Sequence, residues 1–258
     1  MIPKIIHYTW FSNEPMPAEI QACVDSWQRY MPDYTLVKWD MDSIAGIDNI
    51  FMREAIGKRK WAFAADLVRL FAVYNQGGIY LDTDMELTRS LNPLLSHRAF
   101  IGREHIFHID NHRTEHYLTS HCFGAEPRHP FIKRCLDYYE GRRFVTGTCP
   151  DIPVSLRLDM TMLPYIQSEI AKQWGYNPST GRNTIQNLPD GLTVYPDTYF
   201  DPEKITPDSY GRHLALGSWR EITQAKPRTD WRYRLERAIV AVLSPVLNRL
   251  GYAVIKKN

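Results

Sequence analysis

Long apolar runs and paired cysteines are both missing from this 258-residue chain. No stretch approaches the roughly 20 consecutive apolar residues that cross a bilayer, and the N-terminus lacks the apolar stretch of a signal peptide. The four cysteines, Cys23, Cys122, Cys135 and Cys149, lie far apart and form no Cys-x-x-Cys pair. We therefore expect buried, reduced thiols in a cytoplasmic protein, and neither a disulfide framework nor a zinc site.

A strong net charge is missing as well. The chain carries 31 basic and 29 acidic residues, a formal charge of +2, so no global field indicates a nucleic-acid partner. The charge is unevenly placed, however, because residues 228–258 hold seven Lys or Arg and only two Asp or Glu. A basic tail on a mildly acidic body suggests an anionic surface as its partner.

Strand and helix patterns alternate over the first hundred residues. Lys4–Phe11 and Tyr34–Trp39 are rich in β-branched and aromatic side chains, as strands are, whereas Pro17–Tyr30 and Lys60–Asn75 place apolar residues at helical spacing. A further apolar strand is expected over Ile79–Leu87. This order predicts an α/β fold, a parallel sheet covered by helices, with ligands at the carboxyl ends of the strands.

The pattern is looser beyond residue 95. We expect strands at Ala99–Arg103 and Tyr117–Gly124, helices at Pro130–Tyr139 and Leu156–Trp174, and a long irregular segment at Asn177–Asp208. The first 225 residues are long enough to form one domain with a full core.

Residues 226–258 are predicted to be a separate basic amphipathic helix. Leucine, isoleucine and valine form a stripe at helical spacing, arginine and lysine flank it, and Pro245 would kink it. Two interpretations stay open: the helix lies in a membrane interface, or it packs on the domain or on a second subunit.

Two aspartates follow the apolar strand after Gly77-Gly78. In an extended segment Asp82 and Asp84 point to the same face, about 7 Å apart, and repel each other unless a positive charge lies nearby. Mg²⁺ or Mn²⁺ satisfies that demand, because carboxylates suit these cations and substrate phosphates often complete their coordination. The alternative is an ordinary solvated strand end.

The preceding helix carries a second pair of charges. Asp66 and Arg69 are three residues apart in an otherwise apolar segment, so they share one helix face and need partners. Arg69 could hold Asp66 or another aspartate in place, or reach a phosphate or a sugar hydroxyl. Taken alone, the pair is more often a structural salt bridge.

Three segments in this order, Ile2–Phe11, Ala64–Arg69 and Gly77–Asp84, resemble glycosyltransferase family 32, whose sugar-binding region contains a DXD motif. That family is related to the α-glycosyltransferases of mannan and capsule synthesis, and remotely to the clostridial glucosylating toxins. A weaker similarity continues through Gly124–Pro130 and His213–Trp219.

The resemblance implies a GT-A fold, a Rossmann-like single domain with a mixed, mostly parallel sheet, and a UDP-linked sugar with Mn²⁺ or Mg²⁺. It assigns the chemistry to Asp66, Arg69, Asp82 and Asp84, and it places Asp66 and Arg69 at the donor sugar or ribose. Asp84 would ligate the metal directly, and Asp82 would contact both metal and ribose.

The remaining site residues come from both ends of the family pattern. Tyr8 and Trp10 would line the nucleotide base, although core packing of these rings is as good an interpretation of either one. His213 would be a further metal ligand, and Ser218 and Trp219 would contact the diphosphate.

The reaction expected from the resemblance is hexosyl transfer with retention of configuration, without an assigned catalytic base. A basic tail on a cytoplasmic enzyme fits a lipid-linked oligosaccharide acceptor, such as one on undecaprenyl diphosphate, at the inner face of a bacterial membrane. That setting is typical of capsule or O-antigen synthesis and would make the protein a peripheral membrane enzyme.

Two departures and two rivals accompany this interpretation. Relatives often have asparagine where this chain has Ser120-His121, and Thr-Gly-Pro where it has Thr146-Gly147-Thr148, so the sugar is not predicted. A haloacid-dehalogenase-type phosphatase also uses Asp-x-Asp after a strand, but it wants Thr or Val where this chain has Glu86. The other rival is a non-catalytic sugar-binding module.

Overall fold

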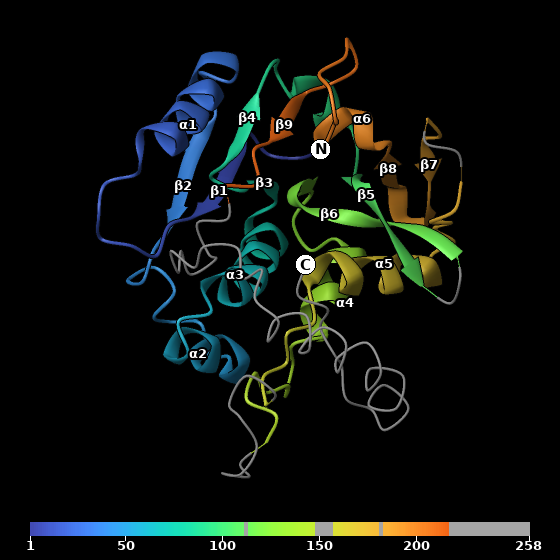
Figure 1. Cartoon of the computed structure of the whole chain (residues 1–258). Helices are drawn as coiled ribbons and strands as arrows, with labels where there is room; N and C mark the ends of the chain where they lie inside the picture. Colours follow the sequence, from blue (N-terminus) through green and yellow to red (C-terminus); the bar gives the residue numbers. More distant parts are fainter. Residues whose placement is uncertain (111–112, 148–156, 181–182, 217–258) are drawn as a thin grey trace, which may run out of the picture. The chain divides into compact units, whose positions relative to one another are not determined.

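The computed structural model describes residues 1–110, 113–147, 157–180 and 183–216 (Figure 1). The strands are β1 (Ile5–Thr9), β2 (Thr35–Trp39), β3 (Gly78–Leu81), β4 (Met85–Leu87), β5 (Ala99–Asp110), β6 (Arg113–Ala125), β7 (Gln186–Asn187), β8 (Leu192–Tyr195) and β9 (Gly211–His213). The helices are α1 (Ala18–Tyr30), α2 (Ile50–Gly57), α3 (Trp61–Gln76), α4 (Pro130–Asp137), α5 (Leu163–Gln173) and α6 (Asp197–Phe200), with short 3₁₀ turns at Asn92–Ser96 and Pro189–Gly191.

A seven-stranded mixed sheet organises the described part of the chain. Its strand order is β2-β1-β3-β6-β5-β8-β7. Strands β2, β1, β3, β5 and β8 run in one direction, and β6 and β7 run against them. A small antiparallel pair, β4 with β9, lies beside this sheet. The expected α/β fold with a mixed, mostly parallel sheet is confirmed.

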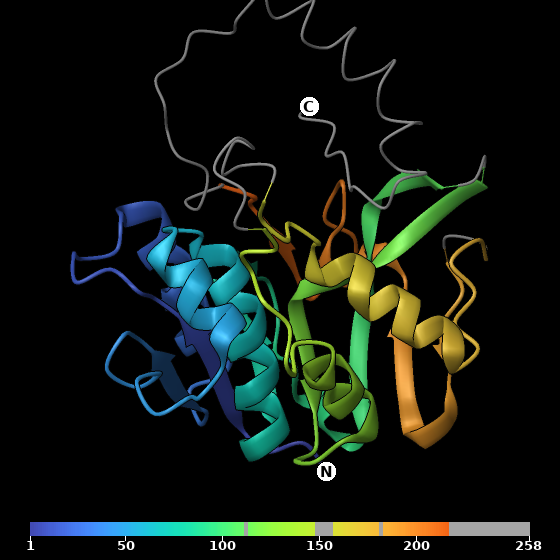
Figure 2. The same cartoon turned by 90° about the horizontal axis from the view of Figure 1, so that it is seen from below.

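Strand alternation divides the core between the two faces of the sheet. In β3, Tyr80 belongs to one apolar cluster while Ile79 and Leu81 belong to the other, as period-two geometry requires. Helices α2, α3, α4 and α5 cover the first face, whereas α1, α6 and the β4–β9 pair lie on the second (Figures 1 and 2). The sheet is thus buried on both sides, and its strand ends are where polar side chains can gather.

The helix before the motif matches its prediction closely and sets up the next strand. α3 is apolar along most of its surface and ends at Gly77, whose φ of 65° is a conformation that favours glycine. A Cβ at Gly77 would lie 2.7 Å from the Pro127 ring, so the close approach of two segments also requires glycine here. β3 therefore begins at once, between β1 and β6.

The continuous strand expected over Ile79–Leu87 is wrong. β3 ends at Leu81, a turn follows in which the Met85 N–H donates to the Asp82 carbonyl (2.9 Å), and β4 then pairs with β9. The turn forms because β4 leaves the central sheet, and the Leu87 N–H binds the Ser26 hydroxyl of α1 (2.9 Å).

Later elements depart more from their predictions. The helix expected over Leu156–Trp174 begins only at Leu163, with Pro164 in its first turn, and the segment ahead of it instead forms a bridge between Val145 and Leu158. The segment Asn177–Asp208 is less irregular than expected, because it contains β7, β8 and α6. α2 was not predicted at all.

Of the cysteines, Cys23, Cys122 and Cys135 are buried free thiols, as expected. No helix among the described residues is long and apolar enough to cross a membrane. The boundary at residue 225 and the amphipathic helix over 226–258 lie outside the described residues and stay predictions, as does the expectation for Cys149.

Candidate active site

The carboxyl end of β3 gathers a charged cluster that we define as Asp66, Arg69, Asp82, Asp84 and His213. Three of its members, Asp82, Asp84 and His213, each offer one ligand atom within 4.8 Å of the others. Asp82 is fixed to β6, because its N–H donates to the His121 carbonyl (2.9 Å), and β9 places His213 opposite Met85. A turn, and not the alternation of a single strand, brings the two aspartates together.

Asp84 and His213 form a buried hydrogen-bonded pair. The His213 Nε2 lies 3.1 Å from the Asp84 Oδ1, and the Asp84 Oδ2 accepts the Leu216 N–H (3.0 Å). Burial is the largest single influence and disfavours both charged forms, but the hydrogen bond of the pair, the attraction between its two charges and further neighbours together outweigh it. The pKa of Asp84 is therefore lowered and that of His213 is raised. Asp84 is therefore ionised at neutral pH.

Arg69 is the centre of the cluster. Its guanidinium lies 3.3 Å from carboxylate oxygens of both Asp66 and Asp82, and its Nη1 donates to the Ser120 carbonyl (2.7 Å). The guanidinium also lies over the ring of Tyr80, 4.6 Å from its centroid, and only 5% of the Arg69 side chain is exposed. One buried cation thus orients two carboxylates. The sequence suggested that Arg69 holds either Asp66 or another aspartate in place, and in the structure it contacts both Asp66 and Asp82.

Asp66 faces Arg69 from one turn earlier in α3. Burial is the main reason that its pKa rises to about 6; the Arg69 cation opposes the rise, and the Asp82 charge adds to it. The Leu163 N–H at the start of α5 donates to the carboxylate. With a pKa of about 6, Asp66 can exchange a proton near neutral pH.

This raised pKa predicts how stability changes with pH. Between the ordinary aspartate pKa of 3.8 and the folded value of about 6, the folded chain holds a proton that the unfolded chain has lost, so stability falls as pH rises through that window. Relative to Asp66→Asn, the wild type should lose about 2 kcal/mol between pH 4 and 6. Urea unfolding at several pH values measures this, and parallel curves for the two proteins would contradict it.

A hydrogen-bond partner of Asp82, and the residue that bonds this partner in turn, were missed in the sequence. The Tyr80 hydroxyl donates to the Asp82 Oδ1 (3.0 Å), and the Thr9 hydroxyl lies 3.0 Å from the Tyr80 oxygen. Thr9 ends β1 and Tyr80 lies in neighbouring β3, so a period-two count along two adjacent parallel strands could have found them. Their hydroxyls connect the ends of both strands to the motif.

The residues expected at the nucleotide base lie at the same end of β1, but their described contacts are elsewhere. The Tyr8 ring packs edge-on against Trp27, with centroids 5.6 Å apart, and the Trp10 Nε1 donates to the Glu14 carbonyl (3.1 Å). Ser218 and Trp219 lie outside the described residues, so their role at the diphosphate stays a prediction.

Sequence reasoning also missed what surrounds His213. The His121 ring stacks on it, and Asp201, which follows α6, accepts hydrogen bonds from the backbone N–H (2.9 Å) and the Nδ1 (2.8 Å) of His105. His121 was noticed only as a departure from the family pattern. Nothing in the local sequence of Asp201 marks it.

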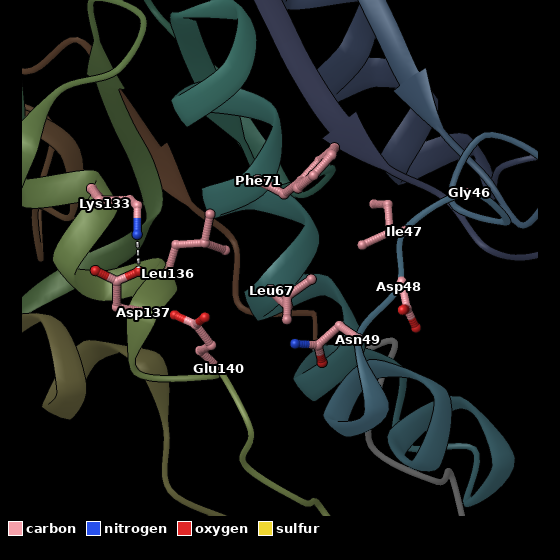
Figure 3. Close-up of a pocket in the computed structure, with 10 residues that line it drawn as sticks. All are labelled: Gly46, Ile47, Asp48, Asn49, Leu67, Phe71, Lys133, Leu136, Asp137 and Glu140. Atoms are coloured by element: carbon pink, nitrogen blue, oxygen red, sulfur yellow. Dashed lines mark hydrogen bonds and ion pairs between the residues drawn. The ribbon is translucent and has the colours of Figure 1, made fainter.

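A hollow elsewhere on the domain is separate from this cluster. It lies between the loop before α2, the side of α3 and the helix α4, and its wall includes Leu67, Phe71 and the ion pair of Lys133 with Asp137 (Figure 3). None of the residues around it belongs to the charged cluster. The cluster at the end of β3 is therefore the candidate site.

Comparisons with known proteins point to the same place in the chain. Residues 17–101 match the family described as a glycosyltransferase sugar-binding region containing a DXD motif. Inositol phosphoceramide mannosyltransferase 3 of Schizosaccharomyces pombe is 34% identical over 51% of this chain and 35% of its own length. A mannosyl phosphorylinositol ceramide synthase of Saccharomyces cerevisiae is 29% identical over 53% of this chain and 35% of its own length. The chain thus spans about a third of the length of these two relatives.

Among solved structures, the PaToxG glycosyltransferase aligns with a TM-score of 0.45 at 19% identity, over 67% of this chain and 69% of its own. A glycosyltransferase involved in glycosylation of the major capsid of PBCV-1 aligns with a TM-score of 0.43 at 12% identity, over 83% and 94%. The matched residues 17–101 hold Asp66, Arg69, Asp82 and Asp84, which are four of the five members of the charged cluster. The resemblance inferred from the sequence is confirmed over this region: residues 17–101 match the DXD-containing sugar-binding region of glycosyltransferases.

Proposed function

We propose that this protein is a metal-dependent glycosyltransferase that moves a hexosyl group from a nucleotide-diphosphate sugar to an acceptor hydroxyl, with retention of configuration. One observation carries the proposal. The ligand atoms of Asp82, Asp84 and His213, from a turn and a distant strand, lie within 4.8 Å of one another, and both aspartates fall within the matched residues 17–101.

The donor set fits a divalent cation. Two carboxylates and one imidazole suit Mn²⁺, and Mg²⁺ accepts the carboxylates together with substrate phosphates. The lowered pKa of Asp84 keeps its carboxylate ionised at neutral pH, as a cation ligand must be. When bound, such a cation neutralises the charge that grows on a departing diphosphate.

The chain's own residues prepare this site. Arg69 and the Tyr80 hydroxyl hold the Asp82 carboxylate, while the Leu216 N–H holds that of Asp84, so neither has to reorganise when the donor arrives. The glycosidic bond to phosphate breaks and the bond from the acceptor oxygen to the same carbon forms. We propose that the leaving phosphate takes the acceptor proton and assign no side chain as base.

The printed names of the relatives suggest which donor and acceptor to test first. Both names join mannose to an inositol-phosphate ceramide, so a mannosyl donor and a phosphorylated lipid acceptor come first here. A UDP-sugar, a lipid-linked oligosaccharide acceptor of bacterial capsule or O-antigen synthesis, and a membrane-bound tail over residues 226–258 are further proposals that rest on the sequence. An aromatic face at Tyr8 or Trp10 would accept uracil or guanine equally well.

The direct experiment follows release of nucleoside diphosphate from a panel of UDP- and GDP-sugars. We expect release that requires Mn²⁺ or Mg²⁺, stops with EDTA, and accelerates with the correct acceptor. Product analysis by NMR would show the retained anomeric configuration.

Different outcomes identify the two rivals. Hydrolysis of phosphomonoesters through an acyl phosphate on Asp82 would favour the phosphatase. Metal-dependent binding of nucleotide sugars without turnover for any acceptor would favour the sugar-binding module.

A further inference from the structure

Two imidazole rings from distant strands lie face to face behind the proposed cation site. His121 is in β6 and His213 is in β9. Their ring centroids are 4.2 Å apart and their planes differ by only 19°. The stack brings a buried histidine, His121, into direct contact with the proposed ligand His213.

His121 could be read as a ligand of its own, because His121, Asp201 and His213 also bring ligand atoms within 4.8 Å of one another. The ring geometry opposes that interpretation. An imidazole nitrogen ligates along a direction in its ring plane, and two nearly parallel stacked rings aim in parallel directions instead of converging on one ion. His121 is therefore placed to support His213 and not to share a metal with it.

His121 is itself held firmly. Its exposed fraction is 3%, and its Nε2 donates to the Phe200 carbonyl at the end of α6 (3.3 Å). Its own carbonyl accepts the Asp82 N–H (2.9 Å). The backbone of His121 thus fixes Asp82 while its ring touches His213, so a single residue connects two of the three proposed ligands.

We propose that His121 is a positioning residue that fixes the plane of the His213 imidazole, with Nε2 directed toward Asp84, so that the third ligand is in place before a cation arrives. This rests on the proposed function, because it requires Asp82, Asp84 and His213 to bind the cation. His213 is in a three-residue strand, and its side chain contacts Asp84 and the His121 ring. Without the stack, the imidazole would have to be ordered when the cation binds.

The test is Mn²⁺ affinity of the metal-free full chain, measured by the electron paramagnetic resonance of free Mn²⁺. We expect His121→Ala to weaken binding about tenfold, the lower end of what outer-shell partners contribute. His121→Phe keeps a flat ring against His213 and should stay within about threefold of the wild type. His213→Ala should weaken binding at least as much as His121→Ala.

A matched control removes a buried histidine elsewhere. His129 directly precedes α4 and is 1% exposed. Like His121, it uses its Nε2 to bond a backbone carbonyl, here that of Asp190 (3.1 Å). His129→Ala should lower the melting temperature and leave Mn²⁺ affinity unchanged. If His121→Ala does not fold, His121→Asn removes the ring with a smaller loss of volume and carries the same expectation.

The outcomes separate this inference from the function on which it rests. Wild-type Mn²⁺ affinity in His121→Ala, with weak binding in His213→Ala, would overturn the positioning role and leave the cation site standing. Equal weakening in His121→Ala and His121→Phe would also overturn it, because the Phe200 hydrogen bond and not the stack would then matter. Unchanged affinity in His213→Ala and in Asp84→Asn would overturn both proposals.

Discussion

Replacing Asp84 by asparagine should lower kcat/KM for sugar transfer about 10³-fold, because a ligand worth about 4 kcal/mol to the transition state is lost. Asparagine has the same shape and can still accept the Leu216 N–H, which bonds the Asp84 Oδ2. It cannot supply the negative charge that a divalent cation prefers. Initial rates of nucleoside diphosphate release at saturating Mn²⁺ measure the effect, and circular dichroism checks the fold.

Glu86 provides the matched control for Asp84. It is two residues further along, in β4, and its carboxylate pairs with Arg212 at the surface (2.6 Å). Glu86→Gln removes the same charge two residues further along, in β4, without touching the charged cluster, so its kcat/KM should stay within about threefold of the wild type. If both variants lose activity equally, general electrostatics would explain the loss and Asp84 would not be a metal ligand.

The sequence predicts most of the first hundred residues because local patterns determine them. α1 and α3 have clear apolar periodicity, and Gly77 marks the end of α3 through a backbone conformation that few other residues adopt. The elements after residue 150 are short, and β7, β8 and α6 are too short to show a period. The break of the motif strand at Leu81 was missed because apolar residues recur at every second position on both sides of it: Ile79, Leu81, Met85 and Leu87.

The sequence likewise predicts which residues belong to the site but not how they are arranged. Asp66, Arg69, Asp82 and Asp84 lie within 19 residues and could be found as a group from spacing and charge. Their arrangement could not, since it depends on a turn. The pairing of β9 with β4 joins His213 to Met85, which lies 128 residues earlier in the sequence, and the stacking of His121 depends on that pairing. Such contacts come from tertiary packing and leave no periodic signal in the sequence.

Arg69→Met should destabilise the fold by about 3–5 kcal/mol, the usual result of removing one partner of a buried ion pair. Methionine keeps most of the apolar stem but leaves Asp66 and Asp82 facing each other without a cation, and it leaves the Ser120 carbonyl without its donor. Adding Asp66→Asn removes one of the two unpaired charges, so the double variant should be more stable than Arg69→Met alone. Urea unfolding of the single and double variants measures this coupling.

Arg142 offers a closely matched comparison for Arg69. Its guanidinium also binds an aspartate, Asp159 (3.0 Å), and also lies over a tyrosine ring, that of Tyr138 (3.9 Å), but 41% of the side chain is exposed. Because water screens and replaces this ion pair, Arg142→Met should cost at most about 1 kcal/mol. The difference in unfolding free energy between the two variants therefore measures the effect of burying the arginine, because the kinds of contact are the same. If Arg69→Met were no more costly than Arg142→Met, the unpaired carboxylates would have to be protonated or hydrated in the variant, and the charged cluster would be less dry than its contacts indicate.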